Sequence, residues 1–157
     1  MRRRPASSRA HSSRRPAVLR KSAPRFKVRY SCPPDFYDPK SYSHVVEVEG
    51  GRLLFVSGQV PVNAQRQLAS RDFREQVEKV YDNLETVLKS VGAGFEHVLK
   101  TTNYLTNIAQ AKVFREVRDA RFAHVRTRPA STTLVITSLV EPEFLLEIEV
   151  IAAVPAR

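Results

Sequence analysis

The sequence of 157 residues has one cysteine, one methionine, no tryptophan and only five glycines. Because Cys32 stands alone, the chain can form neither an internal disulfide nor a cysteine-rich zinc site, and it fits a reducing compartment. The four histidines share no ligand spacing, so we expect no metal. No apolar run approaches the roughly 18 residues of a membrane span, and no apolar segment follows the basic N-terminus as in a secretory signal peptide.

Acidic residues are missing from the first 29 positions, which hold nine arginines and two lysines. The whole chain carries +10 and this segment +11, so the remainder is close to neutral. A domain that binds nucleic acid through a uniformly basic surface is therefore excluded. We interpret residues 1–29 first as disordered or as an artefact of start-site assignment, since Met1 is the only methionine. An organelle-targeting segment and an RNA-binding arm are the further interpretations.

The chain divides into a tail over 1–29, an extended proline-rich lead-in over 30–43 and one domain over 44–157. Two strand patterns, 44–49 and 52–57, flank a Gly-Gly pair, which is typical of a two-residue hairpin.

Apolar residues spaced by three and four predict a helix that begins at Asp72 and ends before Gly92. A strand over 97–105, a helix from about Asn107 to Val125, and strands over 132–136 and 145–152 follow. This order predicts an α+β domain, β-β-α-β-α-β-β, with both helices on one sheet face.

The opposite sheet face must also be covered if it is apolar. We place Val45, Leu54, Thr102 and Ile136 on that face, and this composition predicts a homo-oligomer.

Glu147 and Glu149 alternate with apolar residues, so both lie on one face of their strand. One interpretation is a solvated sheet face. The other is a carboxylate in a cleft between subunits, where partial burial raises its pKa and suits it to proton transfer. Ser57-Gly58-Gln59 ends the second strand, where it either lines such a cleft or forms a simple turn.

Five segments in this order resemble the reactive intermediate deaminase family, also called the Rid or YjgF family. The resemblance runs from about Tyr42 to Ala153. The segments are Tyr42-Ser43-His44, Leu54–Pro61, Val98–Leu105, Arg128–Thr133 and Leu146–Ala152.

The resemblance implies a chorismate-mutase-like fold with one mixed sheet, a homotrimer with a central barrel, and clefts between the subunits. It also implies cofactor-free, cytoplasmic hydrolysis of enamines and imines, such as 2-iminobutanoate and 2-iminopropanoate, to 2-oxo acids and ammonia. Glu147 aligns with the acidic residue that positions or activates water. The substrate-binding positions are Tyr42, Ser57, Gly58, Gln59, Arg115, Ser131 and Thr133.

Ser131 is the main departure from the family pattern, because deaminating members usually have arginine there to hold the substrate carboxylate. Serine cannot reproduce two parallel charged hydrogen bonds, whose loss costs roughly 1.5–3 kcal/mol. Arg115, Arg126 and Arg128 are candidates to replace it, although each also fits a surface charge. We therefore expect a deaminase with altered substrate preference. The alternatives are a non-catalytic trimer that binds a small metabolite, and RNA association through the tail.

Overall fold

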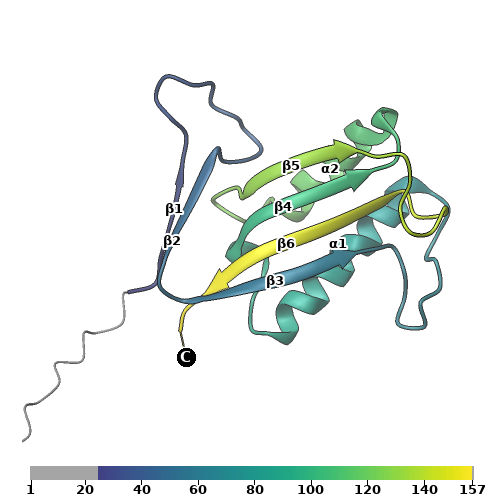
Figure 1. Ribbon diagram of the computed structural model, residues 1–157, viewed down its shortest axis with the longest axis horizontal. Helices are drawn as coiled ribbons and strands as arrows, with labels where there is room; N and C mark the ends of the chain where they lie inside the picture. Colours follow the sequence, from purple (N-terminus) through teal and green to yellow (C-terminus); the bar gives the residue numbers. More distant parts are fainter. Residues whose placement is uncertain (1–24, 157) are drawn as a thin grey trace, which may run out of the picture.

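The computed structural model describes residues 25–156, and its centre is a four-stranded sheet (Figure 1). The strands lie in the order β3 (Arg52–Gln59), β6 (Leu146–Val154), β4 (Val98–Leu105) and β5 (Ala130–Val135). β4 and β5 run parallel, and the other neighbours are antiparallel. The prediction of one mixed sheet in an α+β domain is confirmed, and β5 forms one edge of it.

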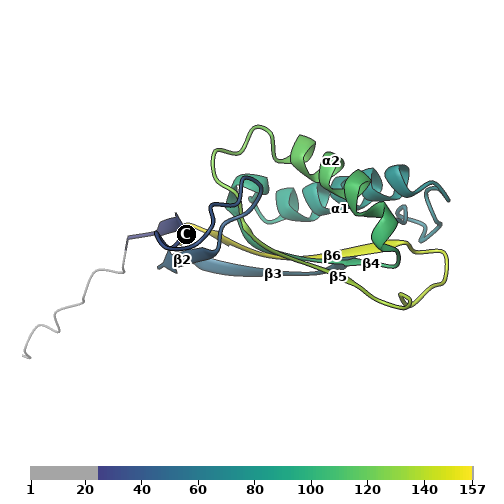
Figure 2. The same ribbon diagram turned by 90° about the horizontal axis from the view of Figure 1, so that it is seen from above.

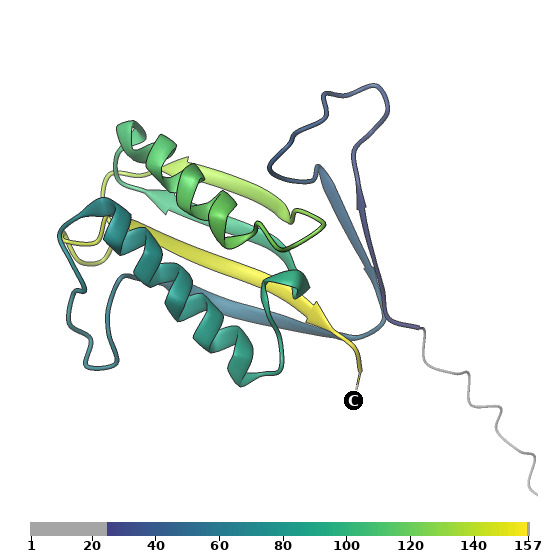
Figure 3. The ribbon, with the colours of Figure 1, turned by 180° about the vertical axis from the view of Figure 1, so that it is seen from behind.

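Both helices pack on the same face of this sheet (Figures 2 and 3). α1 (Phe73–Ser90) begins where predicted, because the Asp72 carboxylate accepts a hydrogen bond from Glu75 N at 3.0 Å. A short 3-10 turn, η1 (Phe95–His97), leads from α1 into β4.

α2 (Ala111–Arg121) follows a second 3-10 turn, η2 (Ile108–Gln110), and ends four residues before the predicted Val125. The carbonyls of Phe122 and Val125 accept hydrogen bonds from the Arg128 side chain instead of continuing the helix.

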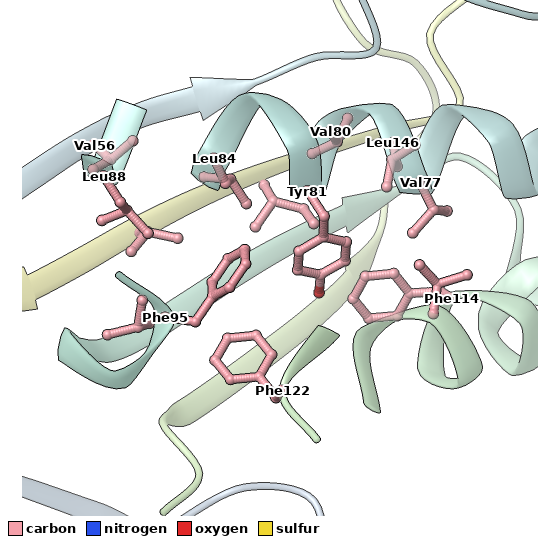
Figure 4. Packing of buried hydrophobic residues seen from close by; sticks show 14 of the residues in the cluster. Val56, Val77, Val80, Tyr81, Leu84, Leu88, Phe95, Phe114, Phe122 and Leu146 are labelled. Carbon is pink, nitrogen blue, oxygen red and sulfur yellow. The ribbon is translucent and has the colours of Figure 1, made fainter. Parts of the chain in front are cut away.

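The hydrophobic core fills the space between the helices and the sheet (Figure 4). α1 contributes the apolar stripe that its spacing predicted, and three aromatic rings from α1, η1 and the end of α2 pack against one another. The stripe is Val77, Val80, Tyr81, Leu84 and Leu88. The rings are Tyr81, Phe95 and Phe122, with centroids 5.2–6.4 Å apart.

A separate two-stranded ribbon projects from the sheet (Figure 1). It consists of β1 (Lys27–Ser31) and β2 (Val45–Glu49), which pair antiparallel. The predicted hairpin between β2 and the next strand is therefore wrong, although Gly50 and Gly51 have the positive φ angles of 67° and 76° that a turn uses. Gly51 packs against Phe26 and the Val154 carbonyl, where a Cβ atom would lie 2.5 and 2.6 Å from its neighbours.

The strand β1 was not predicted, and it lies across the expected boundary between tail and lead-in. Its sequence alternates basic residues with Val28 and Tyr30, and the strand pairs one-to-one with β2. The high positive charge of residues 1–29 favoured a prediction of disorder and outweighed this short strand pattern. The division into 1–29, 30–43 and 44–157 otherwise stays a prediction, and residues 1–24 lie outside the described residues.

Candidate functional site

Glu147 lies on the sheet face that the helices leave open. Along β6, Leu146, Ile148 and Val150 are buried against the helices, while Glu147 and Glu149 point the other way. The prediction that the two glutamates share a face is confirmed. Partial burial, with a smaller contribution from the charge of Glu149, raises the pKa of Glu147, which favours a carboxylate that exchanges protons.

Gly58 provides the space for that carboxylate. The pairing of β3 with β6 shifts between Val56 and Gln59, so Ser57 and Gly58 form a bulge. A Cβ atom on Gly58 would lie 1.7 Å from Glu147 Oε1. The carboxylate therefore rests directly on the Gly58 backbone, and any larger residue at 58 must push it away.

Gln59 does not join this group. It pairs with Ile148, so its side chain faces the α1 side of the sheet, and its Nε2 donates to Ser57 O at 3.0 Å. It lines a surface hollow there together with Asn83.

A second hollow, of about 290 Å³, opens beside Ser57 on the open face. Lys100 lies in it, where burial lowers the Lys100 pKa and Nζ donates to Thr132 Oγ1 at 2.6 Å. The Tyr104 hydroxyl donates to Glu149 Oε1 at 3.4 Å on the same face. The residues of the hollow are Phe55, Val56, Ser57, Lys100, Thr102, Glu149, Val150 and Ile151.

Large apolar side chains surround these polar groups on the open face. Phe55 is 76% exposed and Leu53 is 50% exposed. The predicted placement of Leu54 on this face is wrong, because it packs against the core on the helix side, and Val45 lies on the ribbon. The apolar character of the open face is nevertheless real, and it comes from residues one position away from Leu54.

Ser131 and Thr133 lie on the opposite side of the sheet from Glu147. Thr101 Oγ1 donates to Ser131 Oγ at 3.0 Å. Asn103 Nδ2 lies 3.2 Å from both Ser131 Oγ and Thr133 Oγ1. Thr101 and Asn103 are buried, Ser131 is half-buried and Thr133 is exposed, so these groups form a polar network that runs from β4 to the surface of the edge strand β5.

Tyr42 is held near the start of β5 by its neighbour Ser43. Ser43 N donates to Pro129 O at 3.0 Å, and Ser43 Oγ donates to Arg128 O at 2.7 Å. The Tyr42 hydroxyl forms a hydrogen bond with the Tyr37 hydroxyl, which raises the pKa of Tyr42.

Two arginines line a cavity with Ser131: Arg128, and the buried Arg118, which the sequence did not predict. Arg115 and Arg126 are exposed, and Arg128 donates to backbone carbonyls at the end of α2. Arg118 is only 8% exposed and lines a cavity of about 10 Å³ with Ser131. Its position four residues after Phe114, on the apolar stripe of α2, was the signal that could have revealed its burial.

The candidate residues therefore form two groups that one chain does not bring together. The open-face group is Ser57, Gly58 and Glu147. The edge group is Tyr42, Arg118, Ser131 and Thr133. In one chain the sheet lies between Glu147 and the Ser131 hydroxyl, so the two groups face opposite sides of it.

Residues 25–156 contain no cluster of three or more His, Cys, Asp or Glu side chains able to hold a metal ion. No helix in this part of the chain is long and apolar enough to cross a membrane.

Known proteins share this fold and much of this sequence. The family model described as Endoribonuclease L-PSP matches residues 36–154. A RutC family protein of Aquifex aeolicus is 34% identical over 112 residues, covering 71% of this chain and 86% of its own. The crystal structure of YyfB, a Rid-family protein of unknown function from Yersinia pestis, superposes with a TM-score of 0.75 at 30% identity, covering 81% and 98% of the two chains.

A more distant relative carries an enzyme name. The 2-iminobutanoate/2-iminopropanoate deaminase of Escherichia coli is 26% identical over 110 residues, covering 69% of this chain and 85% of its own. The fold, a mixed sheet with two helices on one face, is the one that these matches share. The chain belongs to the Rid (YjgF) family.

Proposed function

We propose that this protein hydrolyses reactive imines and enamines to carbonyl compounds and ammonia, in clefts between the subunits of a homotrimer. The observation that carries the proposal is Glu147, a partly buried carboxylate that rests on Gly58 and whose pKa is raised. The deaminase name of the Escherichia coli relative supports the reaction class. The single cysteine supports action in a reducing compartment such as the cytoplasm.

The reaction needs one water molecule and no cofactor. Glu147 takes a proton from water as the water oxygen bonds to the imine carbon, and the C=N electron pair moves to nitrogen. Glu147 returns the first proton to that nitrogen, which gives a carbinolamine. Glu147 then takes the carbinolamine hydroxyl proton and passes it to the nitrogen, so that the C–N bond breaks, ammonia leaves and the C=O bond forms. A carboxylate with a pKa raised toward neutrality suits both proton transfers.

The remaining predicted residues would hold the substrate. Ser57 and the Gly58 backbone lie beside Glu147 on one chain, and Tyr42 and Thr133 lie on the edge that a second chain would present. Ser131 replaces a charged anchor with a hydroxyl, so we expect a substrate preference that differs from that of relatives with arginine at this position. Arg115, exposed on α2, is kept as a substrate contact from the neighbouring chain.

The test is ammonia release from freshly generated 2-iminopropanoate and from an uncharged imine. Glu147→Gln preserves size and removes the base, so its rate should fall by about 10²–10⁴-fold on both substrates. Glu149→Gln is the matched control, two residues further along the same face, and should lose less than about tenfold. If wild type and Glu147→Gln are equally inert on both imines, the proposed reaction is wrong.

A non-catalytic trimer that binds a small metabolite is the second candidate, and Ser131 is the observation that favours it. Such a protein would bind 2-oxo acids or related metabolites with no ammonia release from any imine, and Glu147→Gln would leave binding unchanged.

A further inference from the structure

Arg118 is an unusual residue to find buried on α2. The residue is 8% exposed, and its guanidinium carbon lies 5.8 Å from the centre of the Phe114 ring. Buried arginines are ordinarily neutralised by a carboxylate and have their N–H groups bonded. The hydrogen-bond partners of Arg118 therefore show whether each of its N–H groups has an acceptor within the folded chain.

In the described part of the chain, the Arg118 guanidinium contacts a single carboxylate, that of Asp119. Arg118 Nε donates to Asp119 Oδ1 at 3.0 Å, and Nη2 lies 2.9 Å from the same oxygen. That ion pair lacks hydrogen-bond geometry at Nη2, which is buried and has no acceptor within residues 25–156. Asp119 itself is half exposed, with 51% of its side-chain surface accessible. A buried charged donor without an acceptor costs free energy unless a ligand or water completes it.

The neighbouring arginines are satisfied, which makes Arg118 distinct. Arg121 Nη1 lies 2.7 Å from Asp82 Oδ1, and its Nη2 donates to Glu78 O at 3.3 Å. Arg128 donates to two backbone carbonyls at the end of α2. Of these three arginines, Arg118 is the one with a buried side-chain donor that has no hydrogen-bond partner among the described residues.

The cavity beside Arg118 is sized and lined for one oxygen atom. It measures about 10 Å³, close to the space that a single water needs. Two arginines, Arg118 and Arg128, line it together with Asp119 and the hydroxyl-bearing residues Ser41, Thr101 and Ser131. A carboxylate oxygen that enters it would meet hydroxyl groups and two guanidinium groups, of which that of Arg118 is paired with the Asp119 carboxylate.

We infer that Arg118 is the anion-binding residue of this protein, and that it holds the carboxylate of a 2-imino acid behind the short side chain of Ser131. The inference rests on the proposed function for the identity of the ligand. In this arrangement the charge reaches the cleft from α2 instead of from β5. Ser131 contributes its small size and its hydroxyl group.

The test uses binding, so that it does not depend on turnover. Titration calorimetry on the full chain measures the affinity for 2-oxobutanoate and for its uncharged amide. Arg118→Met keeps the packing on Phe114 and removes the charge. It should weaken 2-oxobutanoate binding roughly 10- to 100-fold and leave binding of the amide unchanged. Equal weakening of both ligands, or no change for either, would overturn the inference.

Two further variants control for the fold and for the site. Arg121→Met removes a cation from the same helix, one turn on, and should not change the affinity ratio between acid and amide. Ser131→Arg, added to Arg118→Met, should restore binding of the acid, because a guanidinium then returns to the same place from β5. If it does not, Arg118 and Ser131 do not serve a common ligand and the inference is wrong.

The outcome separates this inference from the proposed reaction. If 2-oxobutanoate binding depends on Arg118 but no ammonia is released, the inference about Arg118 is supported and the proposed deaminase reaction is wrong. Ammonia release from an uncharged imine, together with 2-oxobutanoate binding that does not depend on Arg118, would support the deaminase and contradict the inference about Arg118. A wild-type protein that binds no 2-oxo acid contradicts the inference whatever the ammonia assay shows.

Discussion

The open-face group and the edge group differ in how their charged and polar side chains are held. On the open face, Glu147 rests on glycine backbone, with few contacts to fix its charge and a raised pKa. At the edge, hydroxyl and amide groups form hydrogen bonds with one another around Ser131, and the charged Arg118 side chain is buried. The first arrangement suits a group that gains and loses a proton. The second suits recognition of a fixed charge, so in the proposed function the reaction and the choice of substrate fall on opposite sides of one sheet.

The largest expected effect comes from preventing the two groups from meeting. Phe55→Asp places a charge on the open face, at the strand β3 on its edge, where Phe55 is 76% exposed. If a second chain covers that face, the variant should sediment as single chains and lose deaminase activity and 2-oxo acid binding together, because burying an unpaired charge is costly.

Val140→Asp is the matched control, since Val140 is 82% exposed but lies in the loop before β6. It should leave the assembly and the activity as in wild type. A Phe55→Asp protein that keeps the sedimentation coefficient of wild type would show that the open face is not the contact surface.

The next effect is confined to the open-face group. Gly58→Ala introduces a Cβ atom where Glu147 Oε1 now lies, so the carboxylate must move by about an ångström or more. Such a displacement should lower kcat by about 10²-fold, while the melting temperature changes little because the end of the Glu147 side chain is free to rotate.

Gly92→Ala provides the opposite pattern. Gly92 has a φ of 76° and no neighbour within 4 Å of an added Cβ. Alanine there is strained by roughly 1–2 kcal/mol, which should lower the melting temperature by about 2–8 °C and leave kcat unchanged. Equal losses of kcat in the two variants would mean that Gly58 acts through stability alone.

The smallest effect concerns the pH dependence of stability. The folded-state pKa of Glu147 is raised above its ordinary value of 4.5, so ionisation costs more in the folded chain than in the unfolded chain. Wild type should therefore lose stability relative to Glu147→Gln as pH rises through 4.5 and above.

Melting curves of both proteins between pH 3.5 and pH 7 measure this difference. Glu147→Gln should melt at the higher temperature near pH 7, and the gap should close toward the acid end of the series. A gap that widens toward acid pH would show that the Glu147 pKa is lowered in the folded chain.

The sequence predicted the elements whose signals are local. The α1 stripe, the Asp72 cap and the alternation around Glu147 each depend on neighbours a few residues away, and each is confirmed. The face of Glu147 follows from periodicity alone. The partner of β2 does not, because strand pairing is decided by distant contacts such as that of Gly51 with Val154.

The site was predictable in composition but not in arrangement. Alignment with the family pointed to positions 131 and 147, yet it could not show that a sheet separates them in one chain. The sequence offered Arg115, Arg126 and Arg128 as substitutes for the missing arginine, and the buried Arg118 was not among them. Helical periodicity places Arg118 on the buried stripe, so this part could have been found from the sequence.

In the proposed cleft, one chain supplies Glu147 and another supplies the edge around Ser131. Mixing two inactive proteins tests it: Glu147→Gln, and Ser131→Asp, whose added negative charge should exclude an anionic substrate. After equal amounts are unfolded and reassembled together, about a quarter of the clefts in a closed ring should combine the intact halves of different chains. Ammonia release from 2-iminopropanoate should then return to about a quarter of the wild-type rate. Activity no higher than that of either variant alone would contradict the account.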